Sequence, residues 1–421
     1  MSLLIKNARV IDPVNKIDET SNVYIENGKI AEIGCSLESA DHIIDAEGLV
    51  VAPGLVDMHV HLRDPGFTYK EDIITGCNAA VAGGVTSLLA MPNTNPTTDN
   101  VDTVKYIQDK AKNAKAKVYI AAAITKGLES KEPTDIKALS QVGVIALSDD
   151  GRPVENTQFM ADAMINAPLN GMCVVAHCED LYLAKGGKIN QGEVSSVLGI
   201  KGIPASAEDT GTAREIALAA AYNVPIHICH VSTKTSVALI RDAKARGVNV
   251  TAETAPHYFS LTDKALMSKD ADFRMNPPLR CDDDVEAIIK GLCDGTLDAI
   301  ATDHAPHSPE EKSDFENAPN GSIGMETSLS VGITYLVDKN ILSLPQLIEK
   351  MSVNPAKILN IQAGNLSVGS CADIVIFDPN QEYTVDVEKL HGKSINTPFK
   401  GMKLKGKVKY TIVNGNIVYK D

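Results

Sequence analysis

Through the middle of the chain, apolar, strand-like segments alternate with helical segments. These segments lie between about residue 53 and about residue 360. The helical segments between them carry apolar residues three and four positions apart. Strands that alternate with helices predict parallel pairing, and eight such units predict a TIM-like (β/α)8 barrel, whose active site lies where the strands end. The eight segments are GLVDMHVHL, VTSLLAMP, AKVYIAAAI, GVIALSDD, MCVVAHCED, PIHICHVS, VNVTAETAP and LDAIATDHAP.

Both ends of the chain show a different pattern, in which short β-branched runs are joined by tight turns. An Asn-Gly pair at 27–28 separates two such runs near the N-terminus, and a second pair at 414–415 does the same near the C-terminus. Asn-Gly between two apolar runs is a strong hairpin signal. We therefore expect the two ends to build one small β-sandwich domain. The expected boundaries are residues 1–52 and 364–421 for this domain and 53–363 for the barrel.

Composition restricts the classes of partner. A chain of 421 residues with 44% hydrophobic content can bury a large core, and its net charge of -14 argues against nucleic acid or an anionic membrane as partners. The N-terminal sequence MSLLIKNARVID lacks a signal-peptide pattern, and no apolar stretch is long enough to span a bilayer. Eight scattered cysteines without a C-x-x-C pair are typical of a reducing compartment. A cytoplasmic location is the resulting expectation.

The first strand segment carries two histidines, His59 and His61, separated by one residue. Side chains two apart on a strand point to the same side, so both imidazoles can bind one metal ion. Two histidines with hydrogen bonds in the core would give the same pattern. Further histidines and aspartates at other strand ends favour the metal site, because a barrel brings these ends together around one opening.

The candidate ligands exceed what one tetrahedral ion requires, so we expect a binuclear site. Nitrogen and carboxylate ligands without thiolate favour Zn²⁺, with manganese, cobalt or iron as alternatives. One ion would be bound by His59, His61 and Asp303, the other by His177 and His230, and a carboxylate from the Asp149-Asp150 pair would bridge them. Because such cations lower the pKa of water, hydrolysis of a carbonyl or phosphoryl bond is the expected reaction type.

Seven motifs together resemble the bacterial class I dihydroorotases of the amidohydrolase superfamily, and the likeness covers essentially the whole chain. The motifs are GLVDMHVHLRDPG, MPNTNP, SDDG, AHCED, CHVS, RMNPPLR and ATDHAPHS. The resemblance implies a reversible, zinc-dependent cyclisation of N-carbamoyl-L-aspartate to L-dihydroorotate and water, the third step of pyrimidine biosynthesis.

The resemblance also implies a role for each metal-site residue. His59, His61, His177 and His230 match the metal-binding histidines of the family. Asp303 matches its metal-bound catalytic aspartate, which acts as general acid and base. Most of the superfamily places a carboxylated lysine on the fourth strand, where this chain has Asp149 and Asp150, and Asp150 matches the aspartate of class I members.

Substrate contacts are expected beside the metal site. Arg63 lies two residues after His61 and offers a fork of donors to a carboxylate. By resemblance, Arg63, Asn93 and His307 hold the substrate carboxylate, Asn276 binds the ring amide edge, and backbone groups of Asn320 and Gly321 add contacts, with His61 next to the same substrate. Relatives commonly carry Ala-Pro-Phe-Gly where this chain has Ala-Pro-Asn-Gly at 318–321, which changes the local polarity.

Three further expectations concern His257, His227 and the segment 308–320. His257 at the end of the seventh strand is expected either to support the metal site or to make a structural hydrogen bond. His227 alternates with Cys229, so we expect it to face the outer layer of the barrel. The charged segment 308–320 follows His307, and we hypothesise that it closes over the substrate.

Two rival functions remain at this stage. Another cyclic amide hydrolase, for hydantoin or allantoin, is disfavoured by the absence of a bridging lysine and by the presence of Arg63, Asn93 and His307. A catalytically inactive homologue that acts as a scaffold is disfavoured because every expected metal ligand is present. The family resemblance further suggests a homodimer and an association with aspartate transcarbamoylase, which makes carbamoyl aspartate.

Overall fold

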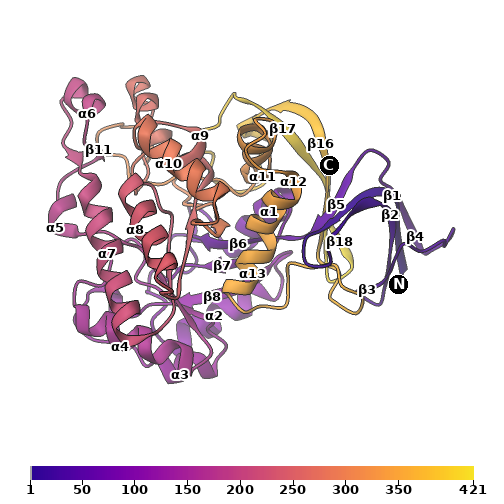
Figure 1. Cartoon of the computed structure of the whole chain (residues 1–421), viewed down its shortest axis with the longest axis horizontal. Helices are drawn as coiled ribbons and strands as arrows, with labels where there is room; N and C mark the ends of the chain where they lie inside the picture. The colour runs from indigo at the N-terminus through magenta and orange to yellow at the C-terminus, as the bar shows by residue number, and fades with distance from the viewer. Residues whose placement is uncertain (1) are drawn as a thin grey trace.

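A barrel of eight parallel strands forms the centre of the molecule, as the computed structural model of residues 2–421 shows (Figure 1). Its strands follow the order of the chain around the barrel, and all eight predicted segments contribute one strand. The backbone N–H of His61 donates to the carbonyl of His304 at 2.9 Å, so the first strand also joins the last. The strands are β6 (Leu55–Val60), β7 (Val85–Ala90), β8 (Lys117–Ala122), β9 (Ala146–Leu147), β10 (Cys173–Ala176), β13 (Ile226–Ile228), β14 (Val250–Thr254) and β15 (Ala299–Ile300).

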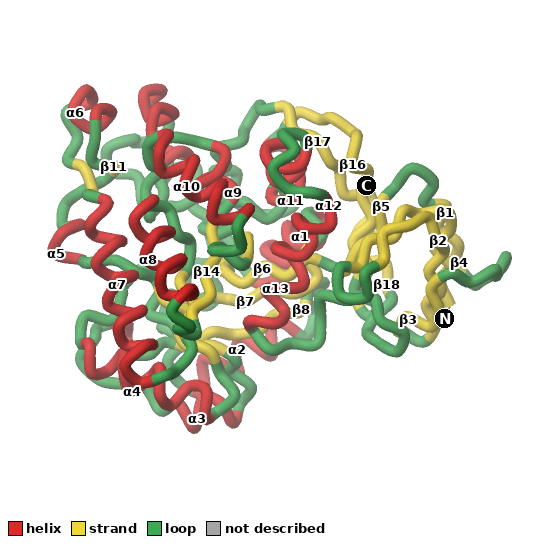
Figure 2. Tube along the Cα trace, viewed as in Figure 1, coloured by secondary structure: helices red, strands yellow, loops and turns green. Residues whose placement is uncertain are grey.

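Helices surround this barrel, with the strands enclosed between them (Figure 2). One main helix follows each of the first seven strands, and three short helices, α11 to α13, follow the eighth. The main helices are α1 (Ile73–Ala82), α2 (Val101–Ala111), α3 (Ile136–Gln141), α4 (Thr157–Leu169), α7 (Ala205–Tyr222), α8 (Lys234–Ala245) and α10 (Asp282–Cys293). The shorter ones are α5 (Leu181–Ala184), α6 (Glu193–Leu198), α9 (Pro256–Ser260), α11 (Ser328–Gly332), α12 (Leu344–Ile348) and α13 (Asn354–Ile358), and β11 (Ile189–Asn190) pairs with β12 (Gly202–Ile203) before α7.

Strand side chains divide between two apolar clusters. One set packs against the helices and includes Ile226 and Ile228 of β13. The other set, which includes Val175 of β10 and Cys229 just beyond β13, forms a separate cluster inside the barrel. Because strand residues alternate between the two faces, this division shows which way a polar side chain points wherever the strand is regular.

The two ends of the chain form one eight-stranded sheet beside the barrel, in agreement with the predicted β domain (Figure 1). Side chains from both halves of this sheet pack into one core, so the predicted sandwich is a single curled sheet with continuous hydrogen bonding. Its strands are β1 (Ser2–Asp12), β2 (Ile17–Glu26), β3 (Lys29–Ile33), β4 (His42–Asp45), β5 (Val50–Pro53), β16 (Ile374–Thr384), β17 (Lys403–Val413) and β18 (Asn416–Lys420).

Both predicted Asn-Gly hairpins are present in this sheet, between β2 and β3 and between β17 and β18. All four turn residues have positive φ, from 52° to 79°, as a type I′ turn requires. The two turns also touch, because a Cβ atom added to Gly28 would lie 2.8 Å from the carbonyl oxygen of Asn414. The turns thereby join the N-terminal and C-terminal parts of the sheet.

The predicted domain boundaries, at residues 52/53 and 363/364, stay a prediction, and Met1 lies outside the described residues. Between residues 2 and 421, no helix combines the length and the apolar character needed to cross a bilayer.

Candidate active site

Six side chains from five strand ends meet inside one opening of the barrel, and all six are buried. They are the residues that the sequence predicts as metal ligands: His59, His61, Asp150, His177, His230 and Asp303.

Asp150 lies between the two groups of histidines. Its Oδ1 is 3.2 Å from Nε2 of His59, and its Oδ2 is 3.4 Å from Nε2 of His61. The same Oδ1 lies 3.6 Å from both Nδ1 of His177 and Nε2 of His230. Burial raises the pKa of Asp150, but the charges of His59 and His61 outweigh this effect and lower it. Asp150 is therefore a carboxylate with four imidazoles around it.

Asp303 completes the group on the side of the first strand. Its Oδ1 lies 3.1 Å from Nε2 of His61 and 3.7 Å from Nε2 of His59. Burial raises the pKa of Asp303, whereas the hydrogen bond from His61 and the charge of His59 lower it further than burial raises it. This carboxyl group is consequently ionised at neutral pH and able to accept a proton.

The donor set fits a divalent cation. His59, His61 and Asp150 offer one ligand atom each within a span of 4.8 Å, and Asp150, His177 and His230 do the same. Among the buried polar atoms without a hydrogen-bond partner are Nε2 of His59 and Oδ1 of Asp150. Buried polar atoms are rarely left unpaired, so these atoms are available to a ligand that satisfies them.

Asp149, the other candidate on the fourth strand, points away from the histidines. Its Oδ1 accepts hydrogen bonds from the backbone N–H groups of Ile124 and Thr125, at 2.7 and 3.1 Å, and Oδ2 accepts one from the Thr125 hydroxyl. The structure thus places Asp150 among the imidazoles and gives Asp149 a structural role in the loop after β8.

Irregular backbone directs several of these side chains into the opening. In the pairing of β6 with β7, the four residues from Asp57 to Val60 oppose the three residues from Leu88 to Ala90, so β6 contains a bulge that turns His59 inward. Arg63, His230 and Asp303 have positive φ values of 61°, 35° and 48°. Such strained conformations in residues other than glycine concentrate at functional sites.

Three polar side chains, of which the sequence indicated only Asn93, lie beside nitrogens of three of the four metal-site histidines. Asn93 Oδ1 lies 2.7 Å from Nδ1 of His61, Glu253 Oε1 lies 2.9 Å from Nδ1 of His59, and Glu179 Oε2 lies 3.5 Å from Nε2 of His177. Glu179 also accepts both contacts of the Asn276 side-chain amide, at 3.3 Å each. Asn93 thus contacts a proposed metal ligand, and Asn276 contacts a residue next to one.

A cationic group lies next to the metal site. Arg63 donates from Nε to the carbonyl of Pro306 at 3.2 Å, and its Nη2 lies 3.5 Å from Nε2 of His307. Lys70, which the sequence analysis missed, lies 3.3 Å from Nδ1 of His307 and 2.8 Å from Glu311. Burial lowers the pKa of Arg63 to about 10, so the guanidinium stays charged at neutral pH. Burial and these cations lower the pKa of His307 to about 3, so its ring is neutral.

The segment that carries Asn320 and Gly321 is fixed by protein contacts. The Gly321 N–H donates to the carbonyl of Arg274 at 2.9 Å, the Asn320 carbonyl lies 2.9 Å from His307 Nε2, and the Arg274 guanidinium donates to the Asn320 side chain at 3.2 Å. The buried Lys312 ammonium donates to the carbonyls of Ala271, Arg274 and Pro319, at 2.9 to 3.1 Å. The hypothesis that residues 308–320 move stays a prediction, and Lys312 is the contact that such a movement would break.

We expect Lys312→Met to loosen residues 308–320, because three buried carbonyls would lose their donor at a cost of about 1–3 kcal/mol. Limited proteolysis should show faster cleavage within this segment, while Lys339→Met, at an exposed position, should be cleaved at the parental rate. An unchanged cleavage pattern in Lys312→Met would contradict the role of this lysine.

The prediction for His227 was wrong. His227 shares a strand face with Cys229, as expected, but this face is the inside of the barrel, where Cys229 belongs to the interior cluster. The Nε2 of His227 lies 3.3 Å from Oε2 of Glu253. His230 reaches the opening only because β13 ends at Ile228 and the positive φ of His230 reverses its direction.

The role predicted for His257 stays a prediction. His257 is buried, and its Nε2 has no hydrogen-bond partner. Burial lowers the pKa of its imidazole to about 4.

Known proteins resemble this chain along its full length. Residues 48–236 match a family model described as dihydro-orotase-like, and residues 296–419 match an amidohydrolase family model. A dihydroorotase from Geobacter metallireducens is 51% identical, with 100% of each chain covered, and one from Acetivibrio thermocellus is 51% identical, covering 100% of this chain and 99% of the other. The chain belongs to the dihydroorotase family. It is therefore related to enzymes that hydrolyse cyclic amides.

Solved structures of other members of the superfamily share the fold. An L-hydantoinase (dihydropyrimidinase) from Arthrobacter aurescens superposes with a TM-score of 0.90 at 26% identity, over 99% of this chain and 96% of the other. A D-hydantoinase gives a TM-score of 0.88 at 27% identity, over 100% and 96%. The superpositions confirm the barrel. The dihydroorotase relatives are about twice as similar to this chain in sequence as the hydantoinases are, which favours the dihydroorotase assignment.

Proposed function

We propose that this protein is a zinc-dependent dihydroorotase, which interconverts N-carbamoyl-L-aspartate and L-dihydroorotate in the third step of pyrimidine biosynthesis. The observation that carries the proposal is the buried group of four histidines and two carboxylates with the Arg63 guanidinium beside it. Full-length similarity to dihydroorotases supports the same function. The metal site explains hydrolysis of an amide, and the arginine explains selection of a substrate with a carboxylate.

A divalent cation bound by these residues would lower the pKa of a water molecule and polarise the amide carbonyl. Asp303 is the proposed general acid and base. In the hydrolytic direction it accepts the proton of the attacking water and delivers it to the ring nitrogen that leaves, and in the biosynthetic direction it reverses both transfers. Its Oδ1 lies 3.1 Å from Nε2 of His61, within the group of residues that would hold the cation.

Arg63, with Asn93 and His307, is proposed to hold the substrate carboxylate, and Asn276, Asn320 and Gly321 to contact the ring. The charged Arg63 supplies the strongest of these interactions, since His307 is neutral. The amide group of Asn276 is supported by Glu179, which fixes its orientation. His61 borders the same substrate while binding the metal.

We expect Arg63→Ala to lower kcat/KM for dihydroorotate by about 10- to 150-fold, as the loss of a charged hydrogen bond worth about 1.5–3 kcal/mol implies. Most of the effect should lie in KM. Dihydrouracil, which lacks the carboxylate, provides the control, because its weak binding should be the same in both proteins. Parental kcat/KM for dihydroorotate in Arg63→Ala would exclude the proposed contact.

The decisive experiment is an assay of the purified, zinc-loaded protein on dihydroorotate, N-carbamoyl-L-aspartate, hydantoin and allantoin in parallel. We expect turnover of the first two. The superposed hydantoinases make a hydantoinase the second candidate. Preferential turnover of hydantoin or allantoin would establish that alternative, and turnover of none of the four would support an inactive scaffold.

Zn²⁺ is proposed as the metal because the ligands are imidazoles and carboxylates without thiolate, with one or two ions per subunit. Residues 1–52 and 364–421 are proposed as one domain and 53–363 as the other. A homodimer and an association with aspartate transcarbamoylase are proposed from the family resemblance, and size measurements on the pure protein, with and without that enzyme, test both.

A further inference from the structure

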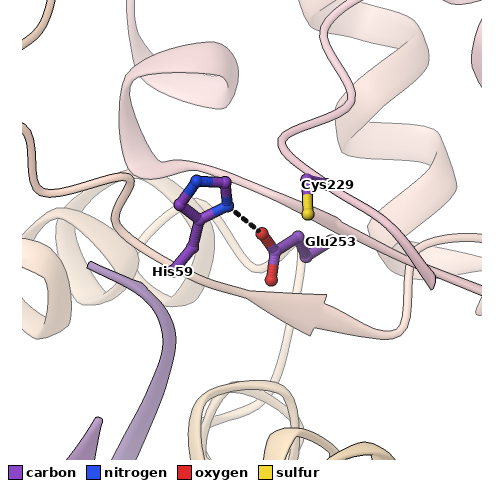
Figure 3. Close-up of side chains that lie close together, drawn as sticks. All are labelled: His59, Cys229 and Glu253. Carbon is purple, nitrogen blue, oxygen red and sulfur yellow. Dashed lines mark hydrogen bonds and ion pairs between the residues drawn. The ribbon is translucent and has the colours of Figure 1, made fainter. Parts of the chain in front are cut away.

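A buried carboxylate, Glu253, lies directly behind the first metal-site histidine. Figure 3 shows His59 and Glu253 with the hydrogen bond between them, and the Cys229 thiol nearby. The Oε1 of Glu253 is 2.9 Å from Nδ1 of His59, and both side chains are at most 1% exposed. A carboxylate so completely removed from water requires strong partners on both oxygens.

The second oxygen of Glu253 faces His227 at ion-pair distance, outside hydrogen-bond geometry. Oε2 lies 3.3 Å from Nε2 of His227, and Nδ1 of His227 lies 2.9 Å from the Thr251 hydroxyl. Thr251 and Glu253 occupy the same face of β14, so one strand supplies both ends of the contact with His227. A continuous line of side chains thus runs inside the barrel from Thr251 to His59.

The contact determines which nitrogen His59 offers to a metal. When Nδ1 carries the proton and donates it to Glu253, Nε2 keeps its lone pair and faces Asp150 at 3.2 Å. The charge of Glu253 also increases the basicity of the ring. The corresponding nitrogen of His61, Nδ1, contacts the neutral side-chain amide of Asn93 and no carboxylate.

The alternative reading of this cluster is a second metal site, because His59, Cys229 and Glu253 offer ligand atoms within 4.8 Å of one another. The geometry argues against it, because Nδ1 of His59 and Oε1 of Glu253 already engage each other at 2.9 Å. Cys229 itself belongs to the apolar cluster inside the barrel.

We propose that Glu253, with His227 beside its second oxygen, is a positioning residue that orients His59 and strengthens its bond to the metal ion. The inference rests on the proposed metal centre and extends it to two residues that the sequence motifs do not include. His227 acts indirectly, because it contacts the carboxylate of Glu253 and not the metal ligand His59.

The test is the zinc affinity of Glu253→Gln, measured by competition with a chromogenic chelator. Glutamine has the size of glutamate and still accepts a hydrogen bond from Nδ1 of His59, so the substitution removes the charge and keeps the packing. We expect about 10- to 100-fold weaker zinc binding, the usual effect of losing such a partner. His227→Gln should weaken binding by a smaller factor, and Glu253→Asp should recover part of the loss.

Leu89→Val provides the matched control, since Leu89 is equally buried in the barrel interior and belongs to its apolar cluster. It should lower the Tm and leave the zinc affinity unchanged. Cobalt-substituted protein offers a second readout, because a changed orientation of His59 should alter the visible absorption of Glu253→Gln and leave that of Leu89→Val at the parental spectrum.

Zinc affinities of Glu253→Gln and His227→Gln within twofold of the parent would overturn the inference. If Glu253→Gln does not fold, the His227→Gln affinity decides by the same criterion. Because affinity is measured without substrate, this result is separate from the proposed activity. A parent that binds zinc but does not turn over dihydroorotate would contradict the proposed function and leave the role of Glu253 intact.

Discussion

Asp303→Asn is expected to lower kcat for dihydroorotate by at least about 10²–10⁴-fold, the range that general acid–base catalysis supplies. An amide oxygen in place of the carboxylate can still contact His61 and a metal, but it cannot take up the proton of the attacking water. Steady-state kinetics in both directions, with zinc content measured on the same sample, would check this result. We expect most of the zinc to remain bound.

The control for this variant is Asp338→Asn, at an exposed aspartate that pairs with Lys405. It should keep the parental kcat. A kcat of Asp303→Asn within tenfold of the parent would show that another group transfers the proton. A complete loss of zinc from this variant would instead show that Asp303 acts mainly as a ligand.

Asp150→Asn is expected to have the largest effect on metal binding, because Asp150 contacts both groups of histidines. Without its charge, the affinity for zinc should fall by more than about 100-fold, since even a partner behind a ligand contributes 10- to 100-fold. Activity should be lost in parallel. Metal content after dialysis and titration with a chelator measure the change.

The adjacent aspartate provides a matched control. Asp149→Asn weakens the hydrogen bonds to Ile124 and Thr125, so we expect it to lower the free energy of unfolding by about 1–3 kcal/mol and to leave zinc affinity near the parental value. Equal losses of zinc from Asp149→Asn and Asp150→Asn would contradict the assignment of separate roles to the two residues.

Much of the barrel could be predicted from the sequence because its strands are apolar and its helices periodic. Each predicted segment contains one strand, although β9 and β15 pair over only two residues. The alternation of strand side chains between two faces could also have distinguished the two aspartates. Leu147 packs against the helices, so Asp149, two residues later, faces outward from the barrel and Asp150 faces inward.

Counting alternate residues along a strand predicted the wrong face where the backbone departs from a regular strand. The bulge in β6 and the positive φ of His230 both reverse the face that a simple count assigns, and neither leaves a clear mark in the sequence. The error for His227 has the same origin, because the inner face was inferred from His230. A regular β13 would have directed His230 toward the helices.

The residues behind the ligands could not be predicted, because their contacts join distant strands. Glu253 lies 194 residues from His59 along the chain, and Lys70 lies 237 residues from His307. One signal was available: Glu253 is the one charged residue in the run VTAETA, whose other residues are apolar or carry a hydroxyl group. A charge at a buried strand position requires a partner, which is a reason to look for one.

The join between the first and last strands has a consequence for assembly of the protein. His61 and Asp303 are 242 residues apart, and the hydrogen bond from His61 N–H to the His304 carbonyl closes the barrel between them. A nascent chain that ends before β15 carries five of the six proposed ligands and an open barrel. Local opening at this join would separate Asp303 from His61, so release of the metal ion should report on the last strand leaving the barrel, before the rest of the fold is lost.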